Sequence, residues 1–133
     1  MADFPVTTFT MSFSQEDVAA FARICGDANP IHLDEAYAAT TPFKRTIMHG
    51  ILGAALFSRG MGMEFPGPGT IYMSQTLAFK RPMYAGTEYT VTLTVTAHDP
   101  AKHTATLLTE IKDTATGKLC TTGEAVVMNA AVL

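Results

Sequence analysis

The sequence predicts an α+β fold in which an antiparallel sheet is covered by a buried apolar helix. Two patterns support this: an apolar run near the middle of the chain, and alternating apolar and polar residues in its second half. With 133 residues the chain has the size of one ordinary domain, so we expect a single domain over residues 1–133. Its apolar share of 47% and charged share of 16% are typical of a folded protein.

The N-terminal quarter of the chain predicts a short strand over 7–11 and a helix over 15–24. Ser14 is a suitable N-cap, and Asp17 in the first turn favours the helix dipole. The residues that recur at helical spacing and should face the core are Val18, Phe21, Ala22 and Cys25.

The first helix must end before Asn29, because Pro30 disfavours helical backbone at the residue before it. Gly26 suits the end of that helix. A second short helix is expected over 35–39, with Asp34 as its cap.

Residues 51–63, ILGAALFSRGMGM, are apolar or small on nearly every side, with Arg59 as the only charge. This pattern predicts a fully buried helix, and the segment is too short to span a membrane. One sheet face cannot cover a helix that is apolar all round. We therefore expect the sheet to curl around it and a second subunit to complete the cover.

The second half of the chain predicts a meander of antiparallel strands. In 87–97 a row of apolar residues alternates with four threonines, which indicates a strand with one buried face. Strands are also expected over 70–80, 104–112 and 119–128, with a turn at 113–117 joining the last two.

Charge and cysteine usage exclude several classes of partner. The net charge is −3 and there is no run of basic residues, so neither nucleic acid nor an anionic membrane is expected as a partner. The N-terminal segment lacks the pattern of a secretory signal, which favours the cytoplasm. Cys25 and Cys120 lie far apart without CxxC spacing, so we expect two reduced thiols and no structural zinc site.

The two basic pairs of the chain admit two interpretations. Lys44-Arg45 and Lys80-Arg81 need no explanation as solvated surface. If the ligand is anionic, they become candidate phosphate contacts.

The stretch 26–32, GDANPIH, places a carboxylate, an amide and an imidazole around a stiffening proline. Asp27 and His32 could converge as a general acid and base. Alternatively, Asp27 and Asn29 cap backbone amides in a turn, and His32 only satisfies its own hydrogen bonds.

A metal site is not expected. The calcium pattern suggested by Asp27, Asn29 and Asp34 lacks its glycine and its distal glutamate. His32 and His49 occur without an HExxH or paired CxxC pattern.

A second candidate element is the dipeptide His49-Gly50, if the apolar helix begins there. The free N–H groups of the first turn, including that of Gly50, can stabilise a developing oxyanion. The simpler alternative is a glycine at a tight helix entry.

The run FARICGDANPIH, followed by Ala38, closely resembles the hydratase signature of MaoC-like (R)-specific enoyl-CoA hydratases. The resemblance continues through YAATTPFKRTIMHGILGAALFS, GTIYMSQTLAFKRPMYAGTEYTV and TGEAVV, from Phe13 to Val127. It implies a hot-dog fold, an antiparallel sheet wrapped around a long central helix. It also implies a homodimer joined at the sheet edges, and the chain length matches the single-hot-dog bacterial type.

The resemblance implies a role for each matching residue. Asp27 and His32 match the catalytic dyad, and Gly50 matches the backbone donor to the thioester carbonyl. Ser58 matches a site-lining serine, although a small residue packed inside a buried helix fits equally well. The supporting residues are then Asn29, Ser58 and His49, and the weaker CoA contacts are Lys44, Arg45, Lys80 and Arg81.

The implied reaction is reversible syn hydration of a trans-2-enoyl-CoA to an (R)-3-hydroxyacyl-CoA, with no cofactor because CoA belongs to the substrate. The alternatives are a 3-hydroxyacyl-acyl-carrier-protein dehydratase and a non-catalytic acyl-CoA-binding protein. A thioesterase fits less well, because those enzymes do not use this GDxNPIH run. Residues that could line an acyl tunnel or belong to the core are Met48, Leu52, Met63, Phe65 and Met73.

Overall fold

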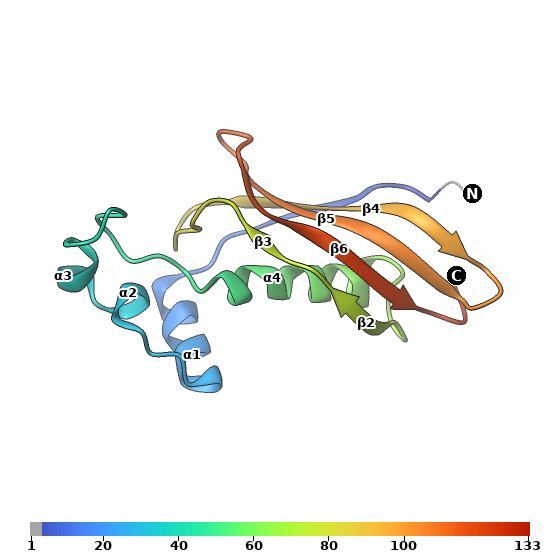
Figure 1. The fold of residues 1–133 in the computed structure, drawn as a ribbon, viewed down its shortest axis with the longest axis horizontal. Helices are drawn as coiled ribbons and strands as arrows, with labels where there is room; N and C mark the ends of the chain where they lie inside the picture. Colours follow the sequence, from blue (N-terminus) through green and yellow to red (C-terminus); the bar gives the residue numbers. More distant parts are fainter. Residues whose placement is uncertain (1–3) are drawn as a thin grey trace.

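The computed structural model describes residues 4–133 and consists of an antiparallel sheet curled over one helix (Figure 1). Residues 1–3, which begin the segment without a secretory pattern, lie outside the described part. The strands are β1 (Thr7–Met11), β2 (Ile71–Gln75), β3 (Ala78–Phe79), β4 (Tyr89–Asp99), β5 (Thr104–Asp113) and β6 (Leu119–Met128). They form one six-stranded sheet in the order β1-β4-β5-β6-β2, and β3 also pairs with β6. This arrangement confirms the predicted fold class.

The helix α4 (Gly50–Arg59) runs along one face of the sheet and continues into the π-helical turn η1 (Gly60–Glu64). Its buried face packs on the sheet through residues that join the core of β4, β5 and β6. These are Leu52, Leu56, Phe57 and Met61. Two glycines permit the close approach: a Cβ at Gly53 would lie 2.7 Å from Met83 Sδ, and one at Gly60 would lie 2.7 Å from Leu93 Cδ1.

The single chain does not bury this helix on every side. Ile51 is 56% exposed, and Ala55 and Ser58, one and two turns further along, are also exposed. The sheet covers only one face of α4, which leaves an apolar stripe on the other.

Three helices precede α4 and project beyond one end of the sheet (Figure 1). The first, α1 (Gln15–Cys25), begins at Ser14, whose side chain accepts a hydrogen bond from Asp17 N, as expected. Val18 and Ala22 are buried, whereas Cys25 is exposed, so its predicted core position was wrong. The helix ends at Cys25, and only its inner face contacts the body of the protein.

The other two helices are single turns. The helix α2 (Pro30–Leu33) was not predicted: Pro30 begins it, where the missing N–H of proline has no cost. The helix α3 (Glu35–Ala38) was predicted, and Asp34 caps it by accepting a hydrogen bond from Tyr37 N. No helix in the described part is long and apolar enough to cross a membrane.

The predicted strands are confirmed, with two irregularities. The expected strand over 70–80 is divided into β2 and β3, and β4 bulges between Val95 and Ala97. Every residue of β2 from Ile71 to Ser74 is exposed, and β2 pairs only with β6. The outer edge of β2 therefore has no strand partner within residues 4–133.

Candidate active site

The turn between α1 and α2 positions Asp27. Gly26 adopts a left-handed conformation with φ of 85°, which favours glycine, and its N–H donates to Ala22 O to end α1. Asp27 Oδ1 then accepts a hydrogen bond from Asn29 N at 3.2 Å, and Asn29 Oδ1 accepts one from Ile31 N at 3.2 Å. The capping interpretation is therefore correct for both residues, and it leaves Asp27 Oδ2 free to face His32.

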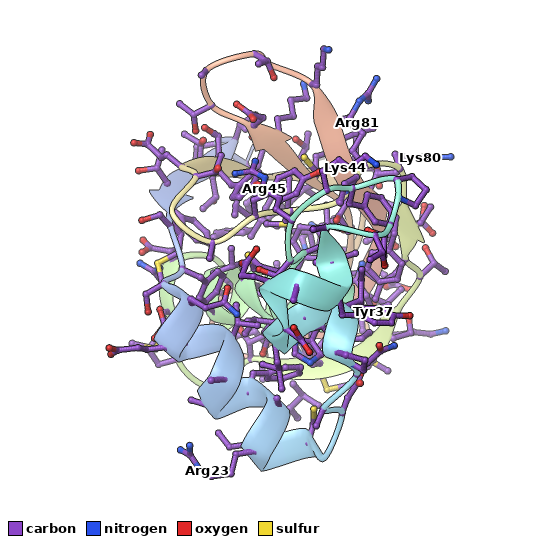
Figure 2. All side chains as sticks on the ribbon, turned by 90° about the vertical axis from the view of Figure 1, so that its left-hand side faces the viewer. Arg23, Tyr37, Lys44, Arg45, Lys80 and Arg81 are labelled. Carbon is purple, nitrogen blue, oxygen red and sulfur yellow. The ribbon has the colours of Figure 1, made fainter. Side chains whose placement is uncertain are left out.

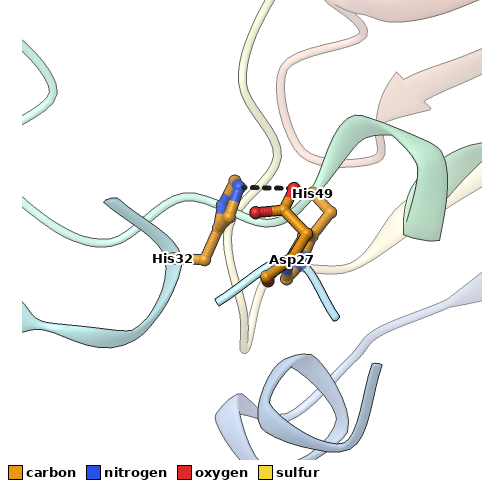
Figure 3. Close-up of side chains that lie close together, drawn as sticks. All are labelled: Asp27, His32 and His49. Carbon is orange, nitrogen blue, oxygen red and sulfur yellow. Dashed lines mark hydrogen bonds and ion pairs between the residues drawn. The ribbon is translucent and has the colours of Figure 1, made fainter. Parts of the chain in front are cut away.

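His32 lies on α2 and is only 8% exposed. Its Nδ1 lies 2.8 Å from Ile47 O, and because a carbonyl only accepts, Nδ1 carries the hydrogen. Its Nε2 lies 3.9 Å from Asp27 Oδ2 (Figure 3). That distance is too long for a direct hydrogen bond but allows one water to contact both atoms.

His49 precedes α4 and contacts both members of the pair. Its Nε2 donates to Asp27 O at 2.8 Å, and its ring stacks on that of His32 with centroids 3.8 Å apart. Phe21 packs edge-on against the same imidazole at 5.0 Å. The sequence suggested only that His49 is a supporting residue, because its contacts join positions far apart in the chain.

Asp27, His32 and His49 also form a cluster whose ligand atoms lie within 4.8 Å of one another. His32 Nδ1 and His49 Nε2 are bonded to carbonyl oxygens, whereas His49 Nδ1 is buried without a hydrogen-bond partner among the described residues.

A pocket of about 410 Å³ opens beside His32 and brings it together with Gly50. Gly50 is the first residue of α4, so its N–H has no partner within the helix. A Cβ at this position would lie 2.6 Å from the Phe79 ring, so glycine allows this ring to pack on the helix start. The remaining lining residues are Phe43, Ile47, Met48, Ile51, Phe79, Lys80, Arg81, Pro82, Met83 and Thr121.

Most of this apolar lining was not anticipated. Of the five residues suggested for an acyl tunnel, only Met48 lines the pocket. Phe43, Phe79 and Met83 belong to three separate segments, and no local pattern marks them as neighbours. Ser58 lies on the exposed face of α4 and is not among the lining residues.

Of the two basic pairs, Lys80-Arg81 lines the pocket and Lys44-Arg45 does not. Lys80 and Arg81 line the pocket, and Arg81 Nη1 donates to Leu119 O at 3.0 Å. Arg45 lies over the Tyr84 ring at 3.6 Å, while Lys44 is exposed and does not line the pocket. Figure 2 shows these four cations in the upper part of the view and Arg23 of α1 at its lower edge.

Comparisons with solved structures agree with this geometry. An (R)-hydratase from Aeromonas caviae involved in PHA biosynthesis superimposes with a TM-score of 0.89 and 47% identity, covering 93% of both chains. An R-hydratase from Pseudomonas aeruginosa in the unliganded form gives a TM-score of 0.89 and 42% identity, covering 96% of this chain and 81% of that one.

Sequence comparisons lead to the same group of proteins. The (R)-specific enoyl-CoA hydratase of Aeromonas caviae is 51% identical over 115 residues, which is 86% of this chain and 85% of that protein. The Rhodospirillum rubrum protein of the same name is 44% identical, covering 88% of this chain and 80% of its own length. The family model of the MaoC like domain matches residues 2–118. The chain therefore belongs to the MaoC-like domain family.

Proposed function

We propose that this protein is an (R)-specific enoyl-CoA hydratase, a hydro-lyase that reversibly adds water to trans-2-enoyl-CoA. The observation that supports this most directly is the pairing of Asp27 and His32 beside a pocket that also contains Gly50. The hydratases from Aeromonas caviae and Rhodospirillum rubrum, at 51% and 44% identity, support the same reaction.

In the proposed mechanism one water lies between Asp27 Oδ2 and His32 Nε2. Neutral His32 holds its hydrogen on Nδ1, so its Nε2 is an acceptor, as is an ionised Asp27. The water donates one hydrogen to each and directs an oxygen lone pair at C3 of the substrate. One of the two side chains takes a proton from the water as the C–O bond forms and returns it to C2 on the same face.

The negative charge that develops on the thioester oxygen is stabilised at the start of α4. Gly50 N–H and the positive end of the helix dipole favour an oxyanion there. One such donor contributes roughly 3–4 kcal/mol in the transition state. His49 joins the two halves of the site, because it bonds to Asp27 O and directly precedes Gly50.

The reaction requires no metal or cofactor, since CoA arrives with the substrate.

We further propose a cytoplasmic homodimer. The exposed edge of β2 and the apolar stripe on α4 support the dimer, because both lie uncovered in the single chain.

The experiment that tests the proposed function follows the loss of conjugated enoyl-thioester absorbance with crotonyl-CoA and longer enoyl-CoAs, with chiral analysis of the product. Rapid loss that yields the (R)-3-hydroxyacyl product is the expected result. Formation of the (S)-product, or no reaction at any chain length, would contradict it.

A second candidate is the dehydration of a 3-hydroxyacyl group on acyl-carrier protein. It is supported by 39% identity over 79 residues to the mitochondrial 3-hydroxyacyl-[acyl-carrier-protein] dehydratase of Arabidopsis thaliana. The same water site would run this reaction in reverse. Turnover of an acyl-carrier substrate without turnover of any CoA thioester would favour this candidate.

A further inference from the structure

Asp27, His32 and His49 lie on three separate segments that the fold brings together at the proposed active site (Figure 3). Their possible ligand atoms lie within 4.8 Å of one another, and within residues 4–133 they are the one group of three histidine, cysteine or carboxylate side chains this close. No sequence motif marks this group, because α3 and a further loop separate His49 from the other two. Two imidazoles and one carboxylate are a donor set found at zinc sites.

Both imidazoles hold one nitrogen against a backbone carbonyl. His32 Nδ1 lies 2.8 Å from Ile47 O, and His49 Nε2 lies 2.8 Å from Asp27 O. Because a carbonyl only accepts, these nitrogens carry the hydrogens of the neutral rings, which leaves the lone pairs on His32 Nε2 and His49 Nδ1. A carbonyl or carboxylate on the other ring nitrogen is the usual outer contact of a histidine that ligates a metal ion. Both rings are therefore held in a tautomer that offers a free lone pair.

His49 Nδ1 is a buried nitrogen with no hydrogen-bond partner among the described residues, and His49 is only 4% exposed. Native proteins leave few buried polar atoms without a partner, and an ion or a ligand is one of the reasons for such an atom. The proposed mechanism gives this nitrogen no task, since the attacking water lies between Asp27 and His32. An ion shared by the two imidazoles would give it a partner.

The carboxylate of Asp27 is available as the third ligand. Its Oδ1 accepts a hydrogen bond from Asn29 N, whereas its Oδ2 makes none within the described part of the chain. No lysine or arginine of residues 4–133 lies within 4.0 Å of this carboxylate. The side chain of Asp27 is 55% exposed, and His32 lines the pocket of about 410 Å³, so an ion can enter from solvent.

The stacking of the imidazoles limits the affinity of such a site. The rings of His32 and His49 lie with centroids 3.8 Å apart and planes inclined by 27°. Two ligand atoms on one tetrahedral zinc ion lie about 3.3 Å apart, since each Zn–N bond measures about 2.0–2.1 Å. The imidazoles must therefore tilt apart, and the exposed Asp27 must close in, before all three share an ion. This rearrangement opposes binding, so we expect micromolar affinity rather than the much tighter binding of a structural zinc site.

We propose that Zn²⁺ binds Asp27, His32 and His49 and inhibits the enzyme. The bound ion occupies the place of the attacking water and uses the lone pairs of Asp27 Oδ2 and His32 Nε2, so neither side chain can take a proton from water. The binding is independent of the reaction, whereas the inhibition rests on the proposed function. Zinc therefore switches the hydratase off, and its removal restores the activity.

The first test is calorimetric titration of metal-free protein with zinc chloride, which needs no turnover. We expect one ion per chain, and binding weaker by about tenfold or more in His32→Gln and His49→Gln, with circular dichroism to check the fold of each variant. His103→Gln is the matched control, because His103 contacts Leu133 O outside the cluster and should keep the affinity unchanged. No binding to the unmodified protein, or unchanged binding to both site variants, would overturn the proposal.

The second test identifies the ligands from the visible and near-ultraviolet spectrum of bound Co²⁺. Cys25 is exposed two residues before Asp27, so its thiolate is the alternative ligand. Thiolate ligation adds an intense charge-transfer band, which nitrogen and oxygen ligands do not give. We expect no such band in the unmodified protein, and the same spectrum and affinity in Cys25→Ser. A thiolate band that disappears in Cys25→Ser would assign the ion to the thiol and overturn the proposal.

The last test measures hydration of crotonyl-CoA with zinc and after addition of EDTA. We expect zinc to abolish most of the rate, EDTA to restore it, and Mg²⁺, which prefers oxygen ligands, to have no effect. His49→Gln should need about tenfold more zinc to lose half of its own rate. Zinc binding without loss of rate, or with a gain, would overturn the inhibition and leave the hydratase intact. Metal-free protein that binds zinc but hydrates no enoyl thioester would exclude the hydratase and retain the zinc site.

Discussion

The pair Asp27 and His32 is predicted to carry the chemistry. Asp27→Asn and His32→Gln should each lower kcat by about 100- to 10,000-fold, the contribution of a positioned acid–base group. Both substitutions keep the size of the side chain, so circular dichroism and the melting temperature should stay close to those of the unmodified protein. Asp99→Asn, at the far end of β4, is the control and should keep full activity. A near-normal rate in either site variant would remove that residue from the mechanism.

His49 is predicted to be a positioning residue, because it donates to Asp27 O and stacks on His32. His49→Leu loses both contacts, and misplacement of the pair should lower kcat by about 10- to 100-fold with little change in KM. His49→Gln retains an N–H donor of similar reach and should recover part of that loss. A raised KM with unchanged kcat in His49→Leu would instead indicate substrate binding.

The two cysteines are predicted to react very differently with a thiol reagent. Cys120 is 2% exposed, and burial raises the pKa of its thiol. The thiolate, which is the reactive form, therefore appears only at a higher pH than usual, and Cys120 should stay unlabelled near pH 7. Cys25 is exposed on the described surface. Native protein should take up one equivalent of reagent and denatured protein two; uptake of two by the native form would contradict the buried thiol.

The interruption between β2 and β3 depends on a glycine in the neighbouring strand. A Cβ at Gly123 of β6 would lie 1.8 Å from the backbone oxygen of Thr76. A backbone atom cannot move aside as the end of a flexible side chain can. Gly123→Ala should therefore lower the free energy of unfolding by about 1–3 kcal/mol or more. Gly62→Ala is the control, since a Cβ there meets nothing within 4 Å. Equal melting temperatures in the two variants would contradict this packing.

Elements with a local signal were predicted from the sequence, and those without one were missed. Ser14 and Asp34 indicated where their helices begin, because a capping side chain bonds to backbone within three residues of it in the sequence. The turn of α2 has four residues, which is too short for helical periodicity to show. The break between β2 and β3 depends on Gly123, about fifty residues away in the chain, so the sequence of that segment alone resembles one continuous strand.

The same distinction applies to the candidate site. Asp27 and His32 lie five positions apart, and their stretch resembles a known signature, so the sequence identified them. The stacking of His32 on His49 and the packing of Phe79 on Gly50 join segments that only the fold brings together.

In the whole molecule the site lies where two parts of the fold meet (Figure 1). The helices projecting beyond the sheet supply Asp27 and His32, whereas His49 and Gly50 stand at the start of α4. Small shifts between these parts would change the distance from Asp27 and His32 to the oxyanion donor. The bond from His49 to Asp27 O crosses this boundary, which is why a residue with no proposed chemical step is expected to affect kcat.

The proposed homodimer makes a prediction about the edge of the sheet. Ile71 is 58% exposed on β2, and Ile51 is 56% exposed on α4. If these surfaces are buried between subunits, Ile71→Glu would place an unpaired charge in the interface, which costs several kcal/mol. Light scattering after size-exclusion chromatography should then show a dimer for the unmodified protein and a monomer for Ile71→Glu.

The control for that experiment is Val6→Glu, since Val6 is 57% exposed next to β1, at the opposite edge of the sheet. It adds the same charge at similar exposure and should leave the dimer intact. A monomeric unmodified protein would show that the edge of β2 is a free surface. Dissociation of both variants to the same extent would mean that added charge weakens the dimer regardless of position. Loss of the dimer in Ile71→Glu alone would assign the interface to the β2 edge, where the exposed stripe of α4 would also be covered.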